Sequence, residues 1–346
     1  MSASAGGGAM RRPLRFDEVR EVVRLEERRL AAAVARLAEF SEPFAGGVLA
    51  RGAPGLWVNA CYGAGLEPEP APANARPEAP GADGGFPGGI RAVGVAHAPD
   101  ERRETSAQPV RQRLDRESIA HLCAFHRAAG VEPRIELAPF VEPESLSALA
   151  EFGFVVRGFD SVLARSLEDI DPGSPSEAPP GIAIEAVDAD DPAAVDACAR
   201  VALSGFPAAT SPAAEASLES MRRALALPGV SAIVAKAEAE ADHEAETDGT
   251  DGPQGRIVAA GAIEVIGAVA CLFGASVAPA ARRRGIQGAL LRERLRMSRA
   301  AGARYATIGS RPGAATERNA RRLGFELAYI RTAFVRPEAG LVAIVE

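Results

Sequence analysis

The sequence predicts an α/β fold of the α+β type, built from two tandem domains. The chain has 346 residues, which is enough for about two domains with a core each. Residues 268–277 form an apolar run typical of a buried strand, and an arginine- and glycine-rich turn leads from it into an amphipathic helix. A helix that ends in Gly-Phe and is followed by apolar strands occurs in each half, at 153–154 and 324–325. The two halves are therefore expected to share one fold.

The composition argues against several classes of protein. The formal net charge of −7 disfavours a general nucleic-acid binder, because no basic excess is present to neutralise phosphates. No apolar run approaches the roughly 20 residues of a membrane span, and the first residues lack the apolar core of a secretory signal, so we expect a cytoplasmic protein. The cysteines are far apart and form no C-x-x-C pair, which predicts buried thiols and no metal site. They are Cys61, Cys123, Cys198 and Cys271.

The first predicted domain covers residues 1–170. Charges alternate with apolar residues at helical spacing over 16–40, which predicts a surface helix. Short strands are expected at 47–50 and 55–58, and the Pro-, Ala- and Gly-rich tract 66–89 is expected to be a mobile insertion. Three further elements are expected, namely helices over 116–126 and 143–150 and a hairpin over 154–164.

A proline-rich linker over residues 171–180 leads to the second predicted domain, residues 181–340. The acidic stretch 237–253 is expected to be a mobile loop between strands, because it lacks the glycine-turn spacing of a calcium loop. The strand predicted over residues 256–266 carries one carboxylate, Glu264, and precedes the apolar run.

The turn after the apolar run has the chemistry of an anion site. A helix N-terminus leaves backbone N–H groups without intrahelical partners, and the helix dipole adds partial positive charge there. Gly285 and Gly288 would let an anion approach this backbone closely, and Arg282, Arg283 and Arg284 add full charges. The pattern predicts a cradle for a pyrophosphate group.

The same residues resemble a known signature. Val-x-Pro-x-x-Arg-x-x-Gly-Ile, which begins at Val277 and precedes a helix, resembles the acetyl-coenzyme A signature of the GCN5-related N-acetyltransferases (GNAT family). A second landmark of that family, a short helix ending in Leu-Gly-Phe, follows at residues 323–325. The resemblance covers roughly residues 181–337 and departs at Gln287, where the family usually has glycine or alanine.

The resemblance implies a mixed, mainly antiparallel, twisted sheet flanked by helices in each half, and acetyl-coenzyme A as the acyl-donor cosubstrate without a metal. It also implies that backbone groups of the strand before the turn hold the pantetheine arm and polarise the thioester carbonyl. The residues expected to contact coenzyme A are Ser276, Val277, Ala278, Arg282, Arg283, Arg284, Gly285, Ile286, Gln287, Gly288 and Asn319.

The first half lacks an arginine-glycine turn, and residues 108–115 stand in its place. We therefore predict a diverged, non-catalytic companion of the GNAT type that shapes or covers the acceptor site. We expect one coenzyme A site per chain, and we expect residues 178–346 to bind coenzyme A without the first half.

The sequence offers few acid–base groups. Many members of the family carry a tyrosine four residues before the glycine of Leu-Gly-Phe, placed to protonate the leaving thiolate, and Ala320 stands at this position. Glu264 is the predicted base for the amine, directly or through water, and the alternative is an ordinary strand carboxylate that faces solvent. No nucleophile with an adjacent base is recognisable, which favours direct transfer in a ternary complex.

The predicted function is transfer of an acetyl group from acetyl-coenzyme A to a primary amine of a small molecule or peptide, by a monomer or homodimer. One alternative is a catalytically silent regulator that binds coenzyme A, which Ala320 and the diverged first half favour. A second alternative is an arginine-dependent partner of nucleic acid, which the net charge and the lack of interleaved aromatic residues disfavour.

Overall fold

A computed structural model of the chain describes residues 12–66, 114–206, 213–237, 251–252 and 255–343. The N-terminal half contains α1 (Phe16–Leu37), β1 (Phe40–Phe44), β2 (Gly47–Arg51), β3 (Cys61–Tyr62), α2 (Arg116–Arg127), β4 (Arg134–Leu137), α3 (Pro143–Glu151) and β5 (Val155–Ser166). The C-terminal half contains β6 (Ile182–Ala186), α4 (Pro192–Leu203), α5 (Ala214–Leu225), β7 (Val230–Ala237), β8 (Asp251–Gly252), β9 (Gly255–Ile266), β10 (Val269–Val277), η2 (Pro279–Ala281), α6 (Ile286–Ala300), β11 (Tyr305–Ser310), α7 (Ala315–Arg322) and β12 (Glu326–Val335). The predicted insertion and the acidic loop lie almost wholly outside the described residues.

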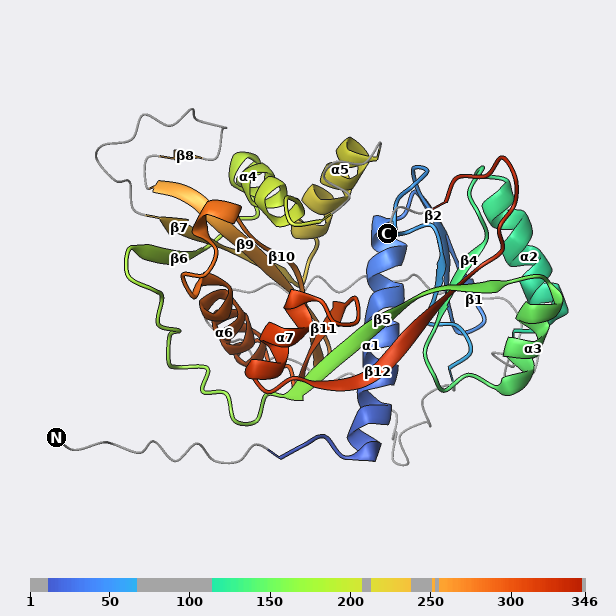
Figure 1. Cartoon of the computed structure of the whole chain (residues 1–346), viewed down its shortest axis with the longest axis horizontal. Helices are drawn as coiled ribbons and strands as arrows, with labels where there is room; N and C mark the ends of the chain where they lie inside the picture. The colour runs from blue at the N-terminus through green and yellow to red at the C-terminus, as the bar shows by residue number, and fades with distance from the viewer. Residues whose placement is uncertain (1–11, 67–113, 207–212, 238–250, 253–254, 344–346) are drawn as a thin grey trace, which may run out of the picture.

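The strands of the described residues form one 12-stranded sheet (Figure 1). Their order is β1-β2-β3-β4-β12-β5-β11-β10-β9-β7-β6, and β8 pairs with β9. Two neighbouring pairs are parallel, β3 with β4 and β10 with β11, and the other pairs are antiparallel. A helix joins the two strands of each parallel pair, as a parallel crossover requires. The predicted mixed, mainly antiparallel sheet is confirmed.

The two halves exchange a strand at the centre of this sheet. β5 of the N-terminal half lies between β11 and β12, and β12 of the C-terminal half lies between β4 and β5. The hairpin predicted over residues 154–164 is therefore wrong, because this segment is one 12-residue strand. Both edges of β5 bond to strands that lie far away in sequence, and local sequence patterns do not reveal such partners.

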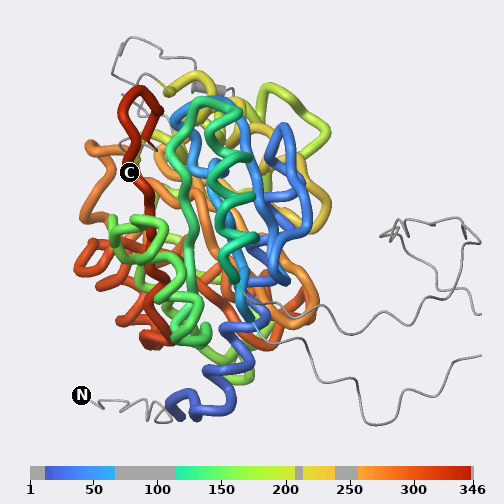
Figure 2. Tube along the Cα trace, turned by 90° about the vertical axis from the view of Figure 1, so that its right-hand side faces the viewer, coloured from blue at the N-terminus to red at the C-terminus, as the bar shows by residue number. Residues whose placement is uncertain are grey.

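Helices cover both faces of the sheet. The apolar side of α1 packs on Val48, Ala50 and Tyr62, whereas α2 and α3 pack on the alternating residues Leu49 and Cys61 of the same strands. In the C-terminal half, α4 and α5 cover the same face of the sheet as α1, and α6 and α7 cover the opposite face. Figure 2 shows α2 and α3 at the end of the molecule nearest the viewer. The helix α1 is thus the element of the first half that lies over the middle of the shared sheet (Figure 1).

The order of elements repeats between the halves. The series β3–α2–β4–α3–β5 corresponds to β10–α6–β11–α7–β12. Each copy closes its short helix with a glycine in the left-handed region, Gly153 at φ 80° and Gly324 at φ 83°. The next residue, Phe154 or Phe325, donates its N–H back to Leu149 or Ala320 of that helix. The tandem repeat predicted from the Gly-Phe pairs is confirmed.

Two local predictions for the first half are wrong. The helix expected to reach residue 40 ends at Leu37, and β1 begins at Phe40. The strand expected over 55–58 is a turn, because the side chain of Asn59 accepts from the N–H of Gly52 and donates to two carbonyls of the loop. The four cysteines are buried and free, as predicted. Among the described residues no helix is long and apolar enough to span a membrane.

Candidate functional site

A gap opens between β10 and β11 where their pairing stops. The two strands pair only over Val269–Cys271 and Tyr305–Thr307, yet β10 continues to Val277 and β11 to Ser310. The register of β10 against β9 shifts between Phe273 and Ser276, and Gly274 there has φ 59°. Such a bulge bends the strand. The bend leaves unpaired backbone edges facing each other, which can bind an extended ligand.

The backbone groups at the end of β10 divide between its two edges. The N–H of Ala278 donates to the carbonyl of Val258 on β9 at 2.8 Å, so it is not available to coenzyme A. Because successive residues of a strand direct their backbone groups to opposite edges, those of Val277 face the gap. Ser276 is buried, and its hydroxyl lies 3.3 Å from that of Ser204. Of the three predicted backbone contacts, the geometry favours Val277.

The loop that follows holds an open helix N-terminus. Arg283 has φ 66° and Gly285 has φ 81°, and Gly285 provides no side-chain cap for α6. Consequently the N–H groups of Ile286, Gln287 and Gly288 have no acceptor among the described residues. Consecutive N–H groups around left-handed residues form an anion-binding concavity. The loop therefore has the backbone geometry that a pyrophosphate cradle requires, and the binding of a pyrophosphate there stays a prediction.

The three arginines of the loop are exposed. Nε of Arg282 donates to the carbonyl of Val277 at 3.2 Å, which ties the loop to the end of β10. The linker runs beside the loop, since a Cβ on Gly285 would lie 3.7 Å from Pro179. The side chains of Arg283 and Arg284 form no hydrogen bond or ion pair with the described part of the chain. Their charges are therefore available to an anion.

The second landmark of the sequence lies next to the first. Asn319 on α7 donates to Oε1 of Gln287 on α6 at 2.6 Å and accepts from Arg322 at 2.8 Å. This contact brings together residues that are separated by a helix and a strand in sequence. Gln287, where the sequence departs from the family signature, is therefore the partner of Asn319. Ala320 beside it is fully buried against the core under α6.

The corresponding helix of the first half is closed to anions. The carboxylate of Asp115 caps α2 by accepting from the N–H of Ser118 at 2.9 Å. This carboxylate occupies the position that a phosphate would need, and its negative charge repels one. The N-terminus of α2 is therefore capped by a side chain, whereas that of α6 is not.

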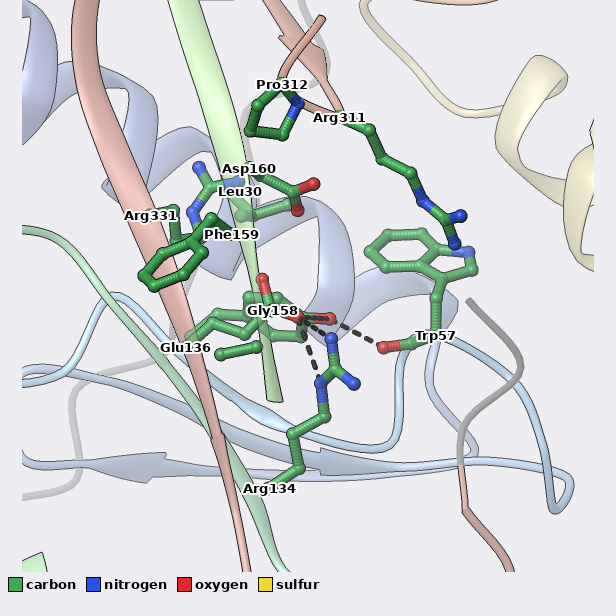
Figure 3. Close-up of a pocket in the computed structure, with 12 residues that line it drawn as sticks. Leu30, Trp57, Arg134, Glu136, Gly158, Phe159, Asp160, Arg311, Pro312 and Arg331 are labelled. Carbon is green, nitrogen blue, oxygen red and sulfur yellow. Dashed lines mark hydrogen bonds and ion pairs between the residues drawn. The ribbon is translucent and has the colours of Figure 1, made fainter. Parts of the chain in front are cut away.

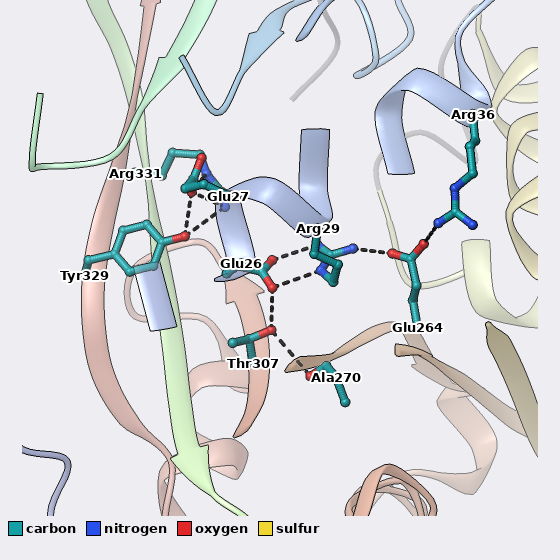
Figure 4. Close-up of polar contacts among 9 residues, drawn as sticks. All are labelled: Glu26, Glu27, Arg29, Arg36, Glu264, Ala270, Thr307, Tyr329 and Arg331. Carbon is teal, nitrogen blue, oxygen red and sulfur yellow. Dashed lines mark hydrogen bonds and ion pairs between the residues drawn. The ribbon is translucent and has the colours of Figure 1, made fainter. Parts of the chain in front are cut away.

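Glu264 lies on the face of the sheet opposite α6, where it is buried between two arginines of α1 (Figure 4). Its carboxylate accepts from Arg29 and from Arg36. The alternative of a carboxylate that faces solvent is wrong, because only 3% of Glu264 is exposed. The sequence did not reveal these partners, since they lie more than 200 residues away. The structure gives Glu264 a role in joining the halves, and its role as a base remains a prediction.

Further buried charges connect α1 to the strands at the base of the gap. Glu26 accepts from Thr307 at 2.7 Å and from Arg29 at 2.7 Å, and Glu27 accepts from Tyr329 at 2.5 Å and from Arg331 at 2.7 Å (Figure 4). Thr307 is the last residue of β11 that pairs with β10. Sequence analysis did not predict this network. The signal that could have revealed it is the presence of charged residues at the positions of α1 that face the sheet.

Burial suppresses the ionisation of one thiol and two phenols in the C-terminal half. It raises the pKa of the Cys271 thiol to about 12, with Glu26 and Glu264 adding to the rise and Arg29 opposing it. Burial, together with Glu21, raises the pKa of Tyr305 to about 12. Burial and the neighbouring Glu27 raise the pKa of Tyr329 as well. Neither a thiolate nucleophile nor an acidic phenol is therefore available at neutral pH. Among the described residues no cluster of three metal-ligating side chains occurs.

No protein-family model matches the sequence, and no curated protein is similar to it. Solved structures with a similar fold include a GCN5-related N-acetyltransferase from Kribbella flavida, at 19% identity over 65% of this chain and 76% of that chain, with a TM-score of 0.45. A tandem GNAT protein from the clavulanic acid biosynthesis pathway is similar at 14% identity over 65% and 70%, with a TM-score of 0.47. A predicted acetyltransferase from Clostridium acetobutylicum, solved with acetyl-CoA, matches over 42% of this chain and 90% of that chain, at 13% identity and a TM-score of 0.30.

The chain's own features support the resemblance of its sequence. The bulged β10, the gap beside β11 and the open arginine-glycine loop at α6 lie together in one half, and a diverged copy of the same elements makes up the other. These are the elements, in a tandem arrangement, that the resemblance of the sequence to the GCN5-related N-acetyltransferases led us to expect.

Proposed function

We propose that the chain transfers an acetyl group from acetyl-coenzyme A to a primary amine, directly within a ternary complex. The observation that carries this proposal is the pairing of two binding features on one strand. The unpaired edge of β10 runs into a loop whose open N–H groups and arginines suit a pyrophosphate. An extended ligand with a pyrophosphate at one end matches both features, and acetyl-coenzyme A has this shape.

In this proposal the pyrophosphate binds at Arg282–Gly288, with Asn319 and Gln287 at its edge. The pantetheine arm extends along β10, and the N–H of Val277 donates to a carbonyl of the ligand. A donor aimed at the oxygen that becomes negative in the transition state contributes a few kcal/mol to the barrier reduction. Holding the amine beside the thioester supplies a further large entropic term.

The reaction needs no covalent intermediate on the protein. The ammonium of the acceptor loses a proton, and the amine nitrogen attacks the thioester carbonyl carbon to form a C–N bond. The tetrahedral intermediate collapses with cleavage of the C–S bond, which releases the thiolate of coenzyme A, and the nitrogen loses its second proton to solvent or to the thiolate. A thiol has a pKa near 8.5, so coenzyme A leaves as a thiolate at little cost at neutral pH. No side chain therefore has to protonate it, although this chain has Ala320 where many family members have a tyrosine.

We further propose that residues 181–340 are the catalytic unit, residues 171–180 the linker, and residues 1–170 a companion without its own coenzyme A site. The support is Asp115, which closes the helix of the first half that corresponds to α6. The exchanged strands mean that each unit completes the sheet of the other.

The test combines titration of coenzyme A with detection of free thiol from acetyl-coenzyme A over a panel of primary amines. One coenzyme A per chain and amine-dependent thiol release are expected. Coenzyme A binding without thiol release for any amine would identify a silent regulator. Cys271→Ala should retain transfer, and mass spectrometry during turnover should find no acetylated cysteine. An acetyl group on Cys271 would overturn direct transfer.

A further inference from the structure

A pocket lined by both charged and apolar residues lies between the two halves on the face of the sheet that α1 covers (Figure 3). Its volume is about 570 Å³, which is within the range of small-molecule sites. Most of its wall comes from the first half, including Leu30 of α1, Trp57, Tyr62 and Glu136. The second half contributes the turn at Arg311 and residues of β12. The site is therefore complete only when the halves are assembled.

Two of the arginines in this pocket are already neutralised. Arg134 donates to Oε1 of Glu136 at 2.9 Å, and Arg331 donates to the buried Glu27 at 2.7 Å. These pairs stiffen the floor of the pocket and leave it with no excess charge.

Two charged groups of the pocket have no such partner. The carboxylate of Asp160 on β5 and the guanidinium of Arg311 after β11 form no hydrogen bond or ion pair with any described residue. They come from neighbouring strands, because Ser161 pairs with Ser310. Both line the same cavity, so one ligand can meet a negative and a positive group at once. A ligand with an ammonium and a carboxylate satisfies both.

The remaining wall is aromatic and apolar. Trp57 packs edge-on against Tyr62, with ring centroids 6.1 Å apart, and the hydroxyl of Tyr62 donates to the carbonyl of Trp57 at 2.6 Å. Trp57 is 41% exposed, and Figure 3 shows the guanidinium of Arg311 extending toward its indole. Leu30 adds an aliphatic contact from α1. A rigid aromatic surface of this kind favours a ligand with an aromatic or large apolar side chain.

The position of the pocket fits an acceptor site. β11 borders the gap predicted to hold the pantetheine arm, and it ends at Ser310. Arg311 and Pro312, which line the pocket, are the next two residues. The pocket and the gap therefore both adjoin the carboxyl-terminal part of β11.

We infer that this pocket binds the acceptor, and that the acceptor is a free amino acid with an aromatic or large apolar side chain. The inference rests on the proposed acetyl transfer. Asp160 holds the ammonium, Arg311 holds the carboxylate, and Trp57 contacts the side chain. This arrangement explains why the first half is retained without a coenzyme A site: it supplies the specificity of the second.

The test measures binding separately from transfer. L-phenylalanine, 2-phenylethylamine and 3-phenylpropionate are titrated into the full chain in the presence of coenzyme A, so that no turnover occurs. Phenylalanine should bind at least about 10-fold more tightly than either analogue, since each lacks one charge-assisted contact. Arg311→Gln should weaken phenylalanine and phenylpropionate about 10-fold and leave phenylethylamine unchanged. Asp160→Asn should weaken phenylalanine and phenylethylamine and leave phenylpropionate unchanged.

Arg299→Gln, at the far end of α6, is the matched control and should leave all three affinities unchanged. Equal weakening of all three ligands by Arg311→Gln and Asp160→Asn, or no binding of phenylalanine, would overturn the inference. Thiol release distinguishes the two proposals. If the ligands bind with the expected charge pattern but no amine is acetylated, the proposed acetyl transfer is wrong and the proposed amino-acid site stands. If other amines are acetylated but phenylalanine does not bind, the proposed amino-acid site is wrong and the proposed acetyl transfer stands.

Discussion

Arg283 has a backbone conformation that a residue with a side chain rarely adopts. Its φ is 66°, and the other described non-glycine residue with positive φ is Ala45 at 44°. Such a conformation costs on the order of 1–2 kcal/mol and is kept where the surrounding structure requires it. In the loop before α6 it turns successive N–H groups toward one side. The strained residue is therefore one whose charge and backbone are both part of the proposed cradle.

Replacing Arg283 by glycine separates these two contributions. Arg283→Gly removes the charge and relieves the strain, so the free energy of unfolding should change by no more than about 1 kcal/mol. The Kd of coenzyme A should rise about 10-fold, by the loss of one charge-assisted contact, and the effect should shrink at high salt. Titration at two ionic strengths measures it. Ala45→Gly is the control, with the same relief of strain and unchanged coenzyme A affinity.

His126 on α2 is buried in the core of the first half, and burial lowers its pKa to about 4. The unfolded chain has the ordinary value of 6.5, so below that pH the unfolded state binds a proton that the folded state does not. The contribution of His126 to stability is therefore fully present above pH 6.5 and is lost as the pH falls toward 4.

Urea unfolding at pH 7 and pH 5 tests this sign. From these pKa values, the native chain should lose about 2 kcal/mol more than His126→Leu over this interval. His121→Gln, which changes the exposed histidine beside Glu42, should behave like the native chain. Equal losses in the native chain and in His126→Leu would show that His126 is protonated in the folded state.

At the scale of elements, α1 holds the two halves together through charge. Its buried side chains reach β9 through Glu264, β11 through Thr307 and β12 through Arg331. Removing one partner from a buried pair costs more than the pair contributes, because the other charge stays buried without compensation. The helix is therefore sensitive to single substitutions at sites remote from the cradle.

Glu264→Gln decides between the two roles of this carboxylate. If Glu264 serves as an ion-pair partner, the substitution should lower the free energy of unfolding by about 3 kcal/mol. Such a role would leave the pH dependence of kcat/KM unchanged. If Glu264 serves as a base, Glu264→Gln should lower kcat/KM about 10²-fold at neutral pH, and the activity should partly recover as the pH rises.

Glu21→Gln is the control for this substitution. Its pair with Arg304 is half-exposed, so the change should cost about 1 kcal/mol or less. A stable Glu264→Gln protein with a native pH profile would refute both roles.

At the scale of the whole molecule, the exchanged strands make the halves dependent on each other. Without β5, the edge of β11 and one edge of β12 would have no partner. Unpaired strand edges aggregate or unfold. The sequence led us to expect that residues 178–346 would bind coenzyme A alone, and the strand exchange argues against it.

A cut in the linker tests this dependence. A protease site placed within residues 171–180 should give two fragments that stay together in size-exclusion chromatography and still bind coenzyme A. Residues 178–346 expressed alone should be insoluble or unfolded by circular dichroism. A soluble fragment with native coenzyme A affinity would show that the second half folds without β5.

Features that depend on residues close together in the chain could be predicted from the sequence. The strand, the arginine-glycine turn and the start of α6 could be predicted, because a glycine at a left-handed position and an uncapped helix N-terminus are local properties. The Gly-Phe repeat was equally local, since each glycine ends the helix just before it.

Contacts between residues far apart in the chain could not be predicted and became visible in the folded structure. The sequence showed Glu264 as a carboxylate on a strand, but it did not show the ion pair with Arg29, which lies 235 residues away. The exchange of β5 and β12, and the pocket that brings Asp160 beside Arg311, also depend on contacts across the sheet. The backbone N–H and C=O groups of a strand can form the same hydrogen bonds with many different strands, so the local sequence does not specify which strand becomes the neighbour. The choice among them is made by the packing of the assembled core.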